Sequence, residues 1–211
     1  MDLTLEQATQ HIIDAGVRLD ARGWAPATAG NYSHRLGDGS VAITVSGNHK
    51  GMLKPGDVMR VDMEAKPLED KKPSAETLLH TSLYKIRPDI NAILHTHSVG
   101  STVLSMQRSG HVTLSGYELL KAFPGVHTHE TSVVLPVFEN KQDMTILAPQ
   151  VEAYLKAHSD TPAYIIRGHG IYGWGKDMAE AERVIEATEF LLNCELEILR
   201  LEKSVAKGLA A

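Results

Sequence analysis

Hydrophobic and polar residues alternate along this chain with two different periods, which predict helices and strands in turn. Apolar residues recur every three or four positions, as in amphipathic helices, over 5–22, 74–86, 99–106, 142–157 and 177–203. Short β-branched or apolar runs predict strands at 41–45, 58–61, 91–94, 112–114, 133–137 and 163–166. The two kinds of segment interleave without a regular βαβ rhythm. We therefore predict an α/β protein with a mixed or antiparallel sheet and helices on both faces.

Local signals mark where several of these elements begin and end. Thr4 followed by Gln7 forms a capping box, which predicts the start of the first helix. Ser74 and Ser98 are suitable N-caps for two further helices, and Pro88 ends the helix that begins at Ser74. Glycines at 37–39 and 168–170 mark turns between strands.

Composition limits the class of protein. The 211 residues suit one large domain over 1–211, and 43% hydrophobic with 22% charged residues exclude a disordered chain. The formal net charge of -5 gives no basic footprint for nucleic acid, so we expect no nucleic-acid partner. The single cysteine, Cys194, fits a reducing compartment, and the short apolar runs give no membrane span. We expect a soluble, cytoplasmic protein.

Histidine is the residue type that points to chemistry. There are 11 histidines, and His95 and His97 end an apolar strand, where residues two apart face the same side. Two imidazoles aimed at one point, with a third from elsewhere, form a three-histidine metal site that leaves a position open for substrate. His169 lies between Gly168 and Gly170, so the backbone can approach closely there, and we predict it as the third ligand.

The other histidines are weaker candidates. His127 and His129 have the same spacing, but they lie in a polar segment that is typical of a loop. The isolated histidines are interpreted as surface or capping residues: His11, His34, His80, His111 and His158.

Two carboxylates and three short segments complete the candidate site. Glu76 and Glu118 each open a predicted helix, and either could serve as a general base or simply favour the helix dipole. Backbone amides, hydroxyls and a lysine suited to phosphate occur at 28–31, 46–50 and Ser74. No Walker A or dinucleotide-binding fingerprint is present.

Five segments together resemble the class II aldolase and adducin family in order and spacing, from about residue 5 to 200. They are TAGNYSHR at 28–35, TVSGNHKG at 44–51, KPSAETLLHTSLY at 72–84, NAILHTHS at 91–98 and RGHGIYGWG at 167–175. The resemblance implies a three-layer α/β/α domain with a mixed, mostly antiparallel sheet, assembled as a homotetramer with one zinc ion per subunit. It places that zinc on His95, His97 and His169. It also places the phosphate of a small sugar-phosphate substrate near Asn31, Ser46, Gly47, Ser74 and the neighbouring Lys50.

Within that family, the chain is more similar to a sugar-phosphate dehydratase than to an aldolase or 4-epimerase. The similarity lies in SGNHKG, in SGYELLKAFPGV at 115–126 and in RGHGIYGWG. It implies that Glu118 is the acid/base, whereas in the aldolases that role falls on the position of Glu76. Because this chain has both carboxylates, the aldolase or epimerase activity stays an alternative. The resemblance to the adducin head implies a second alternative, a metal-free interaction module. The presence of His95, His97 and His169 argues against it.

Overall fold

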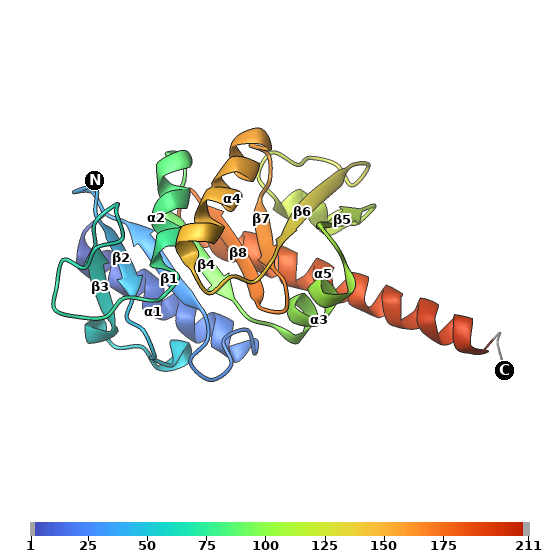
Figure 1. Ribbon diagram of the computed structural model, residues 1–211, viewed down its shortest axis with the longest axis horizontal. Helices are drawn as coiled ribbons and strands as arrows, with labels where there is room; N and C mark the ends of the chain where they lie inside the picture. The colour runs from blue at the N-terminus through green and yellow to red at the C-terminus, as the bar shows by residue number, and fades with distance from the viewer. Residues whose placement is uncertain (1–2, 209–211) are drawn as a thin grey trace.

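The computed structural model describes residues 3–208 as helices packed on one large sheet (Figure 1). The α-helices are α1 (Leu5–Ala21), α2 (Thr77–Ile86), α3 (Val99–Gln107), α4 (Met144–Ala157) and α5 (Met178–Gly208). The first four strands are β1 (Asn31–Arg35), β2 (Val41–Thr44), β3 (Val58–Val61) and β4 (Ala92–Thr96). The last four are β5 (His111–Ser115), β6 (Ser132–Phe138), β7 (Ala163–Ile166) and β8 (Gly170–Gly175). Short 3-10 helices lie at Lys50–Met52, Pro55–Asp57 and Glu118–Ala122.

The eight strands are ordered β3-β2-β1-β4-β8-β7-β6-β5. Every pair is antiparallel except β6 and β7, which are parallel. The central strand β4 therefore lies between β1 and β8, and its register sets His95 opposite both Asn31 and Tyr172. Residues directly opposite one another point to the same face, so these three side chains form one row across the sheet.

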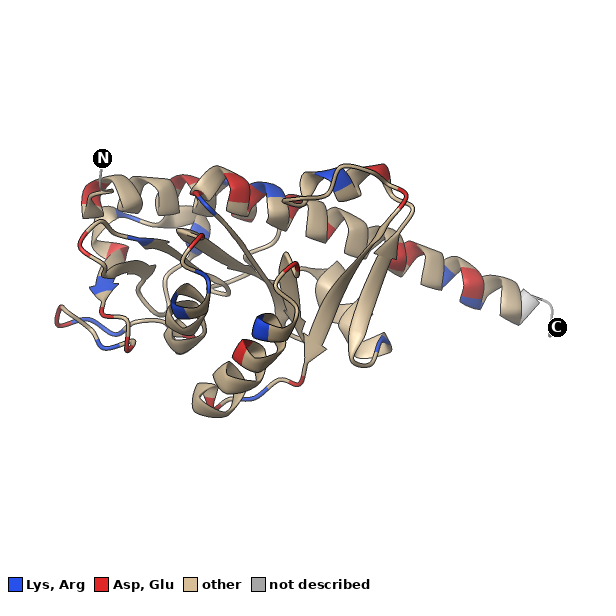
Figure 2. Ribbon diagram, turned by 90° about the horizontal axis from the view of Figure 1, so that it is seen from above, with Lys and Arg blue, Asp and Glu red and all other residues tan. Residues whose placement is uncertain are grey.

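Helices cover both faces of the sheet. Apolar residues of α1, α3 and α5 belong to one buried cluster, and those of α2 and α4 belong to a second cluster. Seen from above, the two long helices α1 and α5 lie on one side of the sheet, and α2 and α4 lie on the other (Figure 2). Burying a side chain such as Leu191 or Leu83 contributes about 1.5–3 kcal/mol, so each face supplies a substantial share of the folding free energy. The predicted three-layer architecture with a mostly antiparallel sheet is confirmed.

Local capping marks the starts of α1 and α3 as the sequence indicates, whereas α2 begins after Glu76 and not after the predicted N-cap Ser74. The Thr4 side chain accepts from the Gln7 amide, and Gln7 returns a bond to the Thr4 amide. Ser98 caps α3 in the same way, through Ser101. The segment after Glu118 is a 3-10 helix rather than an α-helix. None of the helices within residues 3–208 has the length and apolar character needed to cross a membrane.

Candidate metal centre and adjoining cavity

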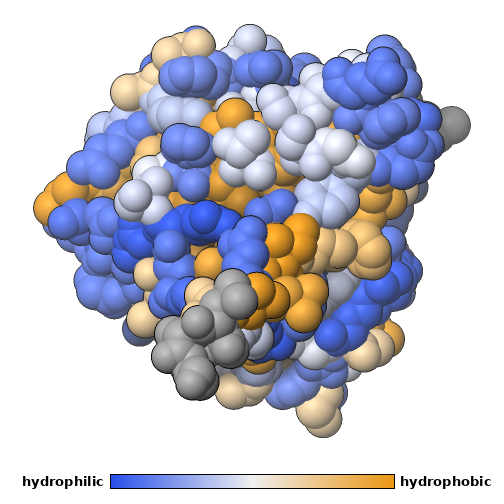
Figure 3. Space-filling model, turned by 90° about the vertical axis from the view of Figure 1, so that its right-hand side faces the viewer, coloured by the Kyte–Doolittle hydropathy of each residue, from blue (hydrophilic) through white to orange (hydrophobic). Residues whose placement is uncertain are grey.

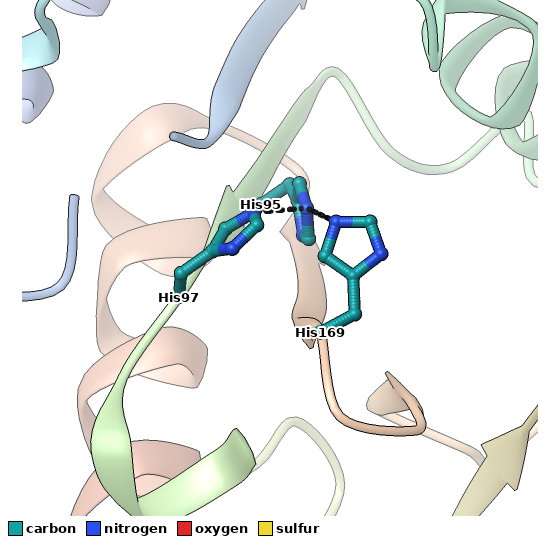
Figure 4. A group of neighbouring side chains, drawn as sticks. All are labelled: His95, His97 and His169. Carbon is teal, nitrogen blue, oxygen red and sulfur yellow. Dashed lines mark hydrogen bonds between the residues drawn. The ribbon is translucent and has the colours of Figure 1, made fainter. Parts of the chain in front are cut away.

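Three imidazoles meet at one end of the central strands. His95 comes from β4, His97 follows that strand directly, and His169 lies in the turn between β7 and β8. The Nε2 atom of His95 is 2.9 Å from that of His97 and 3.3 Å from that of His169 (Figure 4). Thr96, between the first two, faces the opposite layer and donates to Glu189. Strand alternation and a turn thus bring together the three predicted residues.

Two glycines allow His169 to enter this group. Gly168 has a φ of +61°, a left-handed conformation that favours glycine. At Gly170 an added Cβ would lie 2.0 Å from the Thr96 carbonyl oxygen, so only glycine lets β8 approach β4 this closely. The backbone therefore approaches closely beside His169, as the flanking glycines predicted.

The three nitrogens suit a divalent metal. The Nδ1–H of His95 donates to the Ile171 carbonyl at 2.8 Å, which leaves Nε2 free to bind. Burial lowers the pKa of His95 to about 4 and that of His97 to about 3, so both rings are neutral at pH 7. Nitrogens around a tetrahedral zinc lie about 3.3 Å apart, close to the spacings seen here. The geometry of the three nitrogens therefore fits a bound metal ion.

Glu76 lies directly against the triad. Its carboxylate oxygens are 3.2 Å from His95 Nε2 and 3.1 Å from His169 Nε2. The Asn31 amide donates to Oε2 at 2.8 Å, and the Tyr172 hydroxyl donates to the same oxygen at 2.7 Å. Burial alone would raise the pKa of Glu76, but its electrostatic interaction with His95 and the hydrogen bonds from His169 and Tyr172 outweigh burial and lower that pKa. Glu76 is therefore a carboxylate at neutral pH.

A cavity of about 280 Å³ opens beside the triad. Its lining includes Glu76, His97, His169 and all five residues expected near a phosphate: Asn31, Ser46, Gly47, Lys50 and Ser74. The segments 28–31, 44–50 and 74–76 therefore line the same cavity as the imidazoles of His97 and His169.

The Lys50 ammonium is almost completely buried at the edge of this cavity. It donates to the Thr28 carbonyl at 2.9 Å and to the Asn48 carbonyl at 2.6 Å, and so joins two of the loops. Burial lowers the pKa of Lys50 to about 8, which still leaves it mostly charged at neutral pH.

Glu118 is not part of this group within the chain. Its side chain is 73% exposed, lies 2.5 Å from the Lys121 ammonium and 3.4 Å from His129, and borders a hollow with Leu119 and Phe190. Its hydrogen bond with Lys121 lowers the pKa of its carboxyl. The structure thus brings one of the two predicted carboxylates to the triad and leaves the other on the surface.

The isolated histidines differ from the expectation in two places. His80 is completely buried and His34 almost so, which corrects their interpretation as surface or capping residues. Single histidines give no periodic signal, so their burial could be seen only once β1 and α2 were packed together. His158 does cap α4, through the Tyr154 carbonyl, and His127 and His129 are exposed.

Tyr172 is a site residue that the sequence analysis missed. Its ring stacks on His95 with centroids 4.1 Å apart and planes 13° apart, and its hydroxyl binds Glu76. The signal that identifies it is the strand register, because Tyr172 lies directly opposite His95.

An α/β/α fold with a three-histidine site, a buried carboxylate and an adjoining polar cavity defines a class of metal-dependent enzyme. The chain matches the family model for the class II aldolase and adducin N-terminal domain over residues 10–196, and it belongs to that family. A methylthioribulose-1-phosphate dehydratase of Pseudomonas paraeruginosa is 55% identical over 200 residues, which are 94% of this chain and 98% of that protein. The dehydratase of the same name from Methylococcus capsulatus is 53% identical, over 92% of this chain and 95% of its own.

A solved structure agrees with these relatives at the level of fold and class. The L-fuculose-1-phosphate aldolase of Thermus thermophilus superimposes with a TM-score of 0.72 at 26% identity, covering 92% of this chain and 95% of the aldolase.

Proposed function

We propose that this chain is a zinc-dependent dehydratase that converts 5-methylthioribulose 1-phosphate to 2,3-diketo-5-methylthiopentyl 1-phosphate, a step of methionine salvage. The observation that carries the proposal is identity above one half, over nearly the whole chain, with proteins named for this reaction. A three-histidine metal site beside a polar cavity is what such a reaction needs.

The reaction removes one water molecule from the substrate. A base takes the proton at C3, the C4 hydroxyl leaves with a proton, and the resulting enol tautomerises to the 2,3-diketone. When bound by His95, His97 and His169, zinc would polarise the C2 carbonyl and stabilise negative charge that develops on its oxygen.

The cavity residues are assigned to the substrate phosphate. Asn31, Ser46 and Ser74 supply side-chain donors, and Gly47, with a φ of +86° and open space around its Cα, leaves its backbone accessible. Lys50 adds a positive charge near the phosphate position. Its ammonium donates to the carbonyls of Thr28 and Asn48 and does not point into the solvent. Phosphate bound here lies next to the triad, so the substrate carbonyl can reach the metal position.

The general acid/base is assigned to Glu118, supplied by a neighbouring subunit of a homotetramer. Within one chain Glu118 is exposed, and it borders an apolar hollow of about 520 Å³ that includes the half-exposed Phe190. A second copy of the chain that covers this hollow would carry Glu118 out of solvent and toward another triad. Glu76 is the second candidate, because it lies within the same chain beside the ligands.

The proposal also includes a location. A cytoplasmic enzyme fits a chain with one cysteine, Cys194, because the reducing cytoplasm keeps thiols free.

The experiment that tests this function is product analysis. We expect the zinc-loaded protein to consume 5-methylthioribulose 1-phosphate and to form the 2,3-diketone, followed by phosphorus and carbon NMR. The protein with its metal removed by a chelator is the control and should be inactive. If the substrate is untouched while fuculose or ribulose phosphates are cleaved or epimerised, the chain is instead an aldolase or 4-epimerase, and Glu76 becomes its acid/base.

A further inference from the structure

A continuous chain of buried polar side chains runs from the interior of the molecule to Glu76. The Tyr84 hydroxyl lies 2.9 Å from Ser33 Oγ, which lies 2.7 Å from His80 Nδ1. His80 Nε2 lies 2.5 Å from the Asn31 amide oxygen, and the Asn31 amide nitrogen lies 2.8 Å from Glu76 Oε2. Ser33 and His80 are completely buried, and Asn31 is only 4% exposed. Polar groups as buried as these are normally hydrogen-bonded, and here they bond to one another.

The strand β1 and the helix α2 supply these side chains, and their geometry explains why the hydrogen bonds are continuous. Asn31 and Ser33 are two apart on β1, so both point toward α2. Glu76, His80 and Tyr84 are four apart at the start of α2 and along it, so they form one stripe that faces β1. Side chains two apart on β1 thus contact side chains four apart on α2.

Donor and acceptor chemistry fixes the direction of each bond. Glu76 Oε2 already accepts from the Tyr172 hydroxyl, so the Asn31 group that faces it is the amide nitrogen. The Asn31 oxygen then faces His80 and can only accept, and His80 Nε2 must therefore carry a proton.

The rest of the chain follows from the neutral state of His80. Burial lowers the pKa of His80 to about 3, so the ring has one proton, on Nε2, and Nδ1 accepts from the Ser33 hydroxyl. Ser33 Oγ accepts in turn from the Tyr84 hydroxyl, whose oxygen also lies 3.2 Å from the Asn91 carbonyl oxygen. With the other tautomer, His80 Nε2 and the Asn31 oxygen would be two acceptors facing each other. Only the Nε2–H tautomer satisfies every group.

We propose that His80 is a positioning residue that locks the Asn31 amide in one orientation. One N–H of Asn31 is held on Glu76, and the second is left for a phosphate in the cavity that Asn31 lines. An amide turned by 180° would place its oxygen against the Glu76 carboxylate and toward the phosphate, and both contacts would be repulsive. This inference rests on the proposed function for its phosphate ligand.

Phosphate binding tests the role without requiring turnover. Inorganic phosphate is titrated into the zinc-loaded protein and its dissociation constant is measured by phosphorus NMR. We expect His80→Leu to weaken binding by about tenfold, the loss expected for one hydrogen bond to a charged group. His80→Gln should stay within about threefold, because its amide can donate to Asn31 and accept from Ser33. The control is His34→Leu, which replaces another buried histidine, on β1 and outside these hydrogen bonds, and it should bind phosphate like the wild type.

Two results would overturn the role of His80. One is a folded, zinc-loaded His80→Leu protein that binds phosphate as tightly as the wild type. The other is a His80→Gln protein that loses as much as His80→Leu, because the donor and acceptor order would then be irrelevant.

The tautomer gives a second readout in the unmodified enzyme. Long-range proton–nitrogen NMR on protein with labelled histidine should show His80 protonated at Nε2 only. A proton on Nδ1 would contradict the proposal, even if the leucine variant does not fold. If the wild type shows the Nε2–H tautomer yet binds no phosphate, the phosphate assignment of the cavity fails and the orientation of Asn31 stands.

Discussion

At the scale of single residues, the metal site depends on how closely two backbones approach. His95 is oriented by the Ile171 carbonyl and by the stacked Tyr172 ring, both from β8. These contacts exist only because Gly170 lets β8 lie against the Thr96 carbonyl. The histidine triad is therefore a property of a β4–β8 contact as much as of three imidazoles.

Replacing Gly170 by alanine tests this dependence. The new Cβ would lie 2.0 Å from Thr96 oxygen, so the strands must separate and His95 and His169 must move apart. We expect zinc affinity to fall by about ten- to hundredfold, measured by competition with a chelator. Gly56→Ala is the matched control, because nothing lies within 4 Å of its added Cβ. Unchanged zinc affinity in Gly170→Ala would show that the site tolerates a wider strand spacing.

At the scale of elements, α5 holds the ligand strand from behind. Glu189 of α5 is fully buried, accepts from Thr96 at 2.8 Å and also accepts from Ser98, so it binds the residues on either side of His97. Burial raises the pKa of Glu189 to about 7, and the hydrogen bonds from Ser98 and Thr96 only partly offset this.

This buried carboxyl should make folding stability depend on pH. Its pKa rises from 4.5 in the unfolded chain to about 7 in the folded one, so its contribution is fully present below about pH 4.5 and is lost as the pH rises to about 7. We expect the wild type to lose about 3 kcal/mol relative to Glu189→Gln across this window, measured by urea unfolding at constant zinc. Glu197→Gln, exposed on the same helix, is the control. Parallel pH curves for the wild type and Glu189→Gln would mean that Glu189 stays ionised in the fold.

The elements also show how far a sequence alone can lead. Capping at Thr4 and Ser98 and the apolar strand that runs into His95 are local patterns, and the structure follows them. The position of Glu76 beside His169, 93 residues later, depends on how α2 packs over the sheet, and no local pattern encodes it. His80 was misinterpreted as a surface or capping residue and Tyr172 was missed for the same reason, since the partner of His80 lies on β1 and that of Tyr172 on β4.

At the scale of the whole molecule, one chain carries surfaces that a single copy leaves exposed. The last turns of α5 project from the body, and hydrophobic residues lie on the face at that end (Figures 1 and 3). Exposed apolar side chains on α5 include Phe190, Ile198, Leu201 and Val205. Apolar surface of this kind, which at Phe190 adjoins the exposed Glu118, is what a contact between identical subunits would cover.

Mixing two inactive variants distinguishes a shared site from a site within one chain. Glu118→Gln removes the proposed acid/base, and His97→Ala removes a proposed metal ligand, so each variant on its own should be inactive. If Glu118 acts on the triad of a neighbouring subunit, random mixing of the two proteins gives about one quarter of the sites an intact triad and an intact Glu118. We therefore expect about a quarter of the wild-type turnover after subunit exchange. If Glu118 acts within its own chain, no mixed site is complete and the mixture stays inactive. If Glu118→Gln alone keeps wild-type turnover, the acid/base is Glu76, the carboxylate already at the triad.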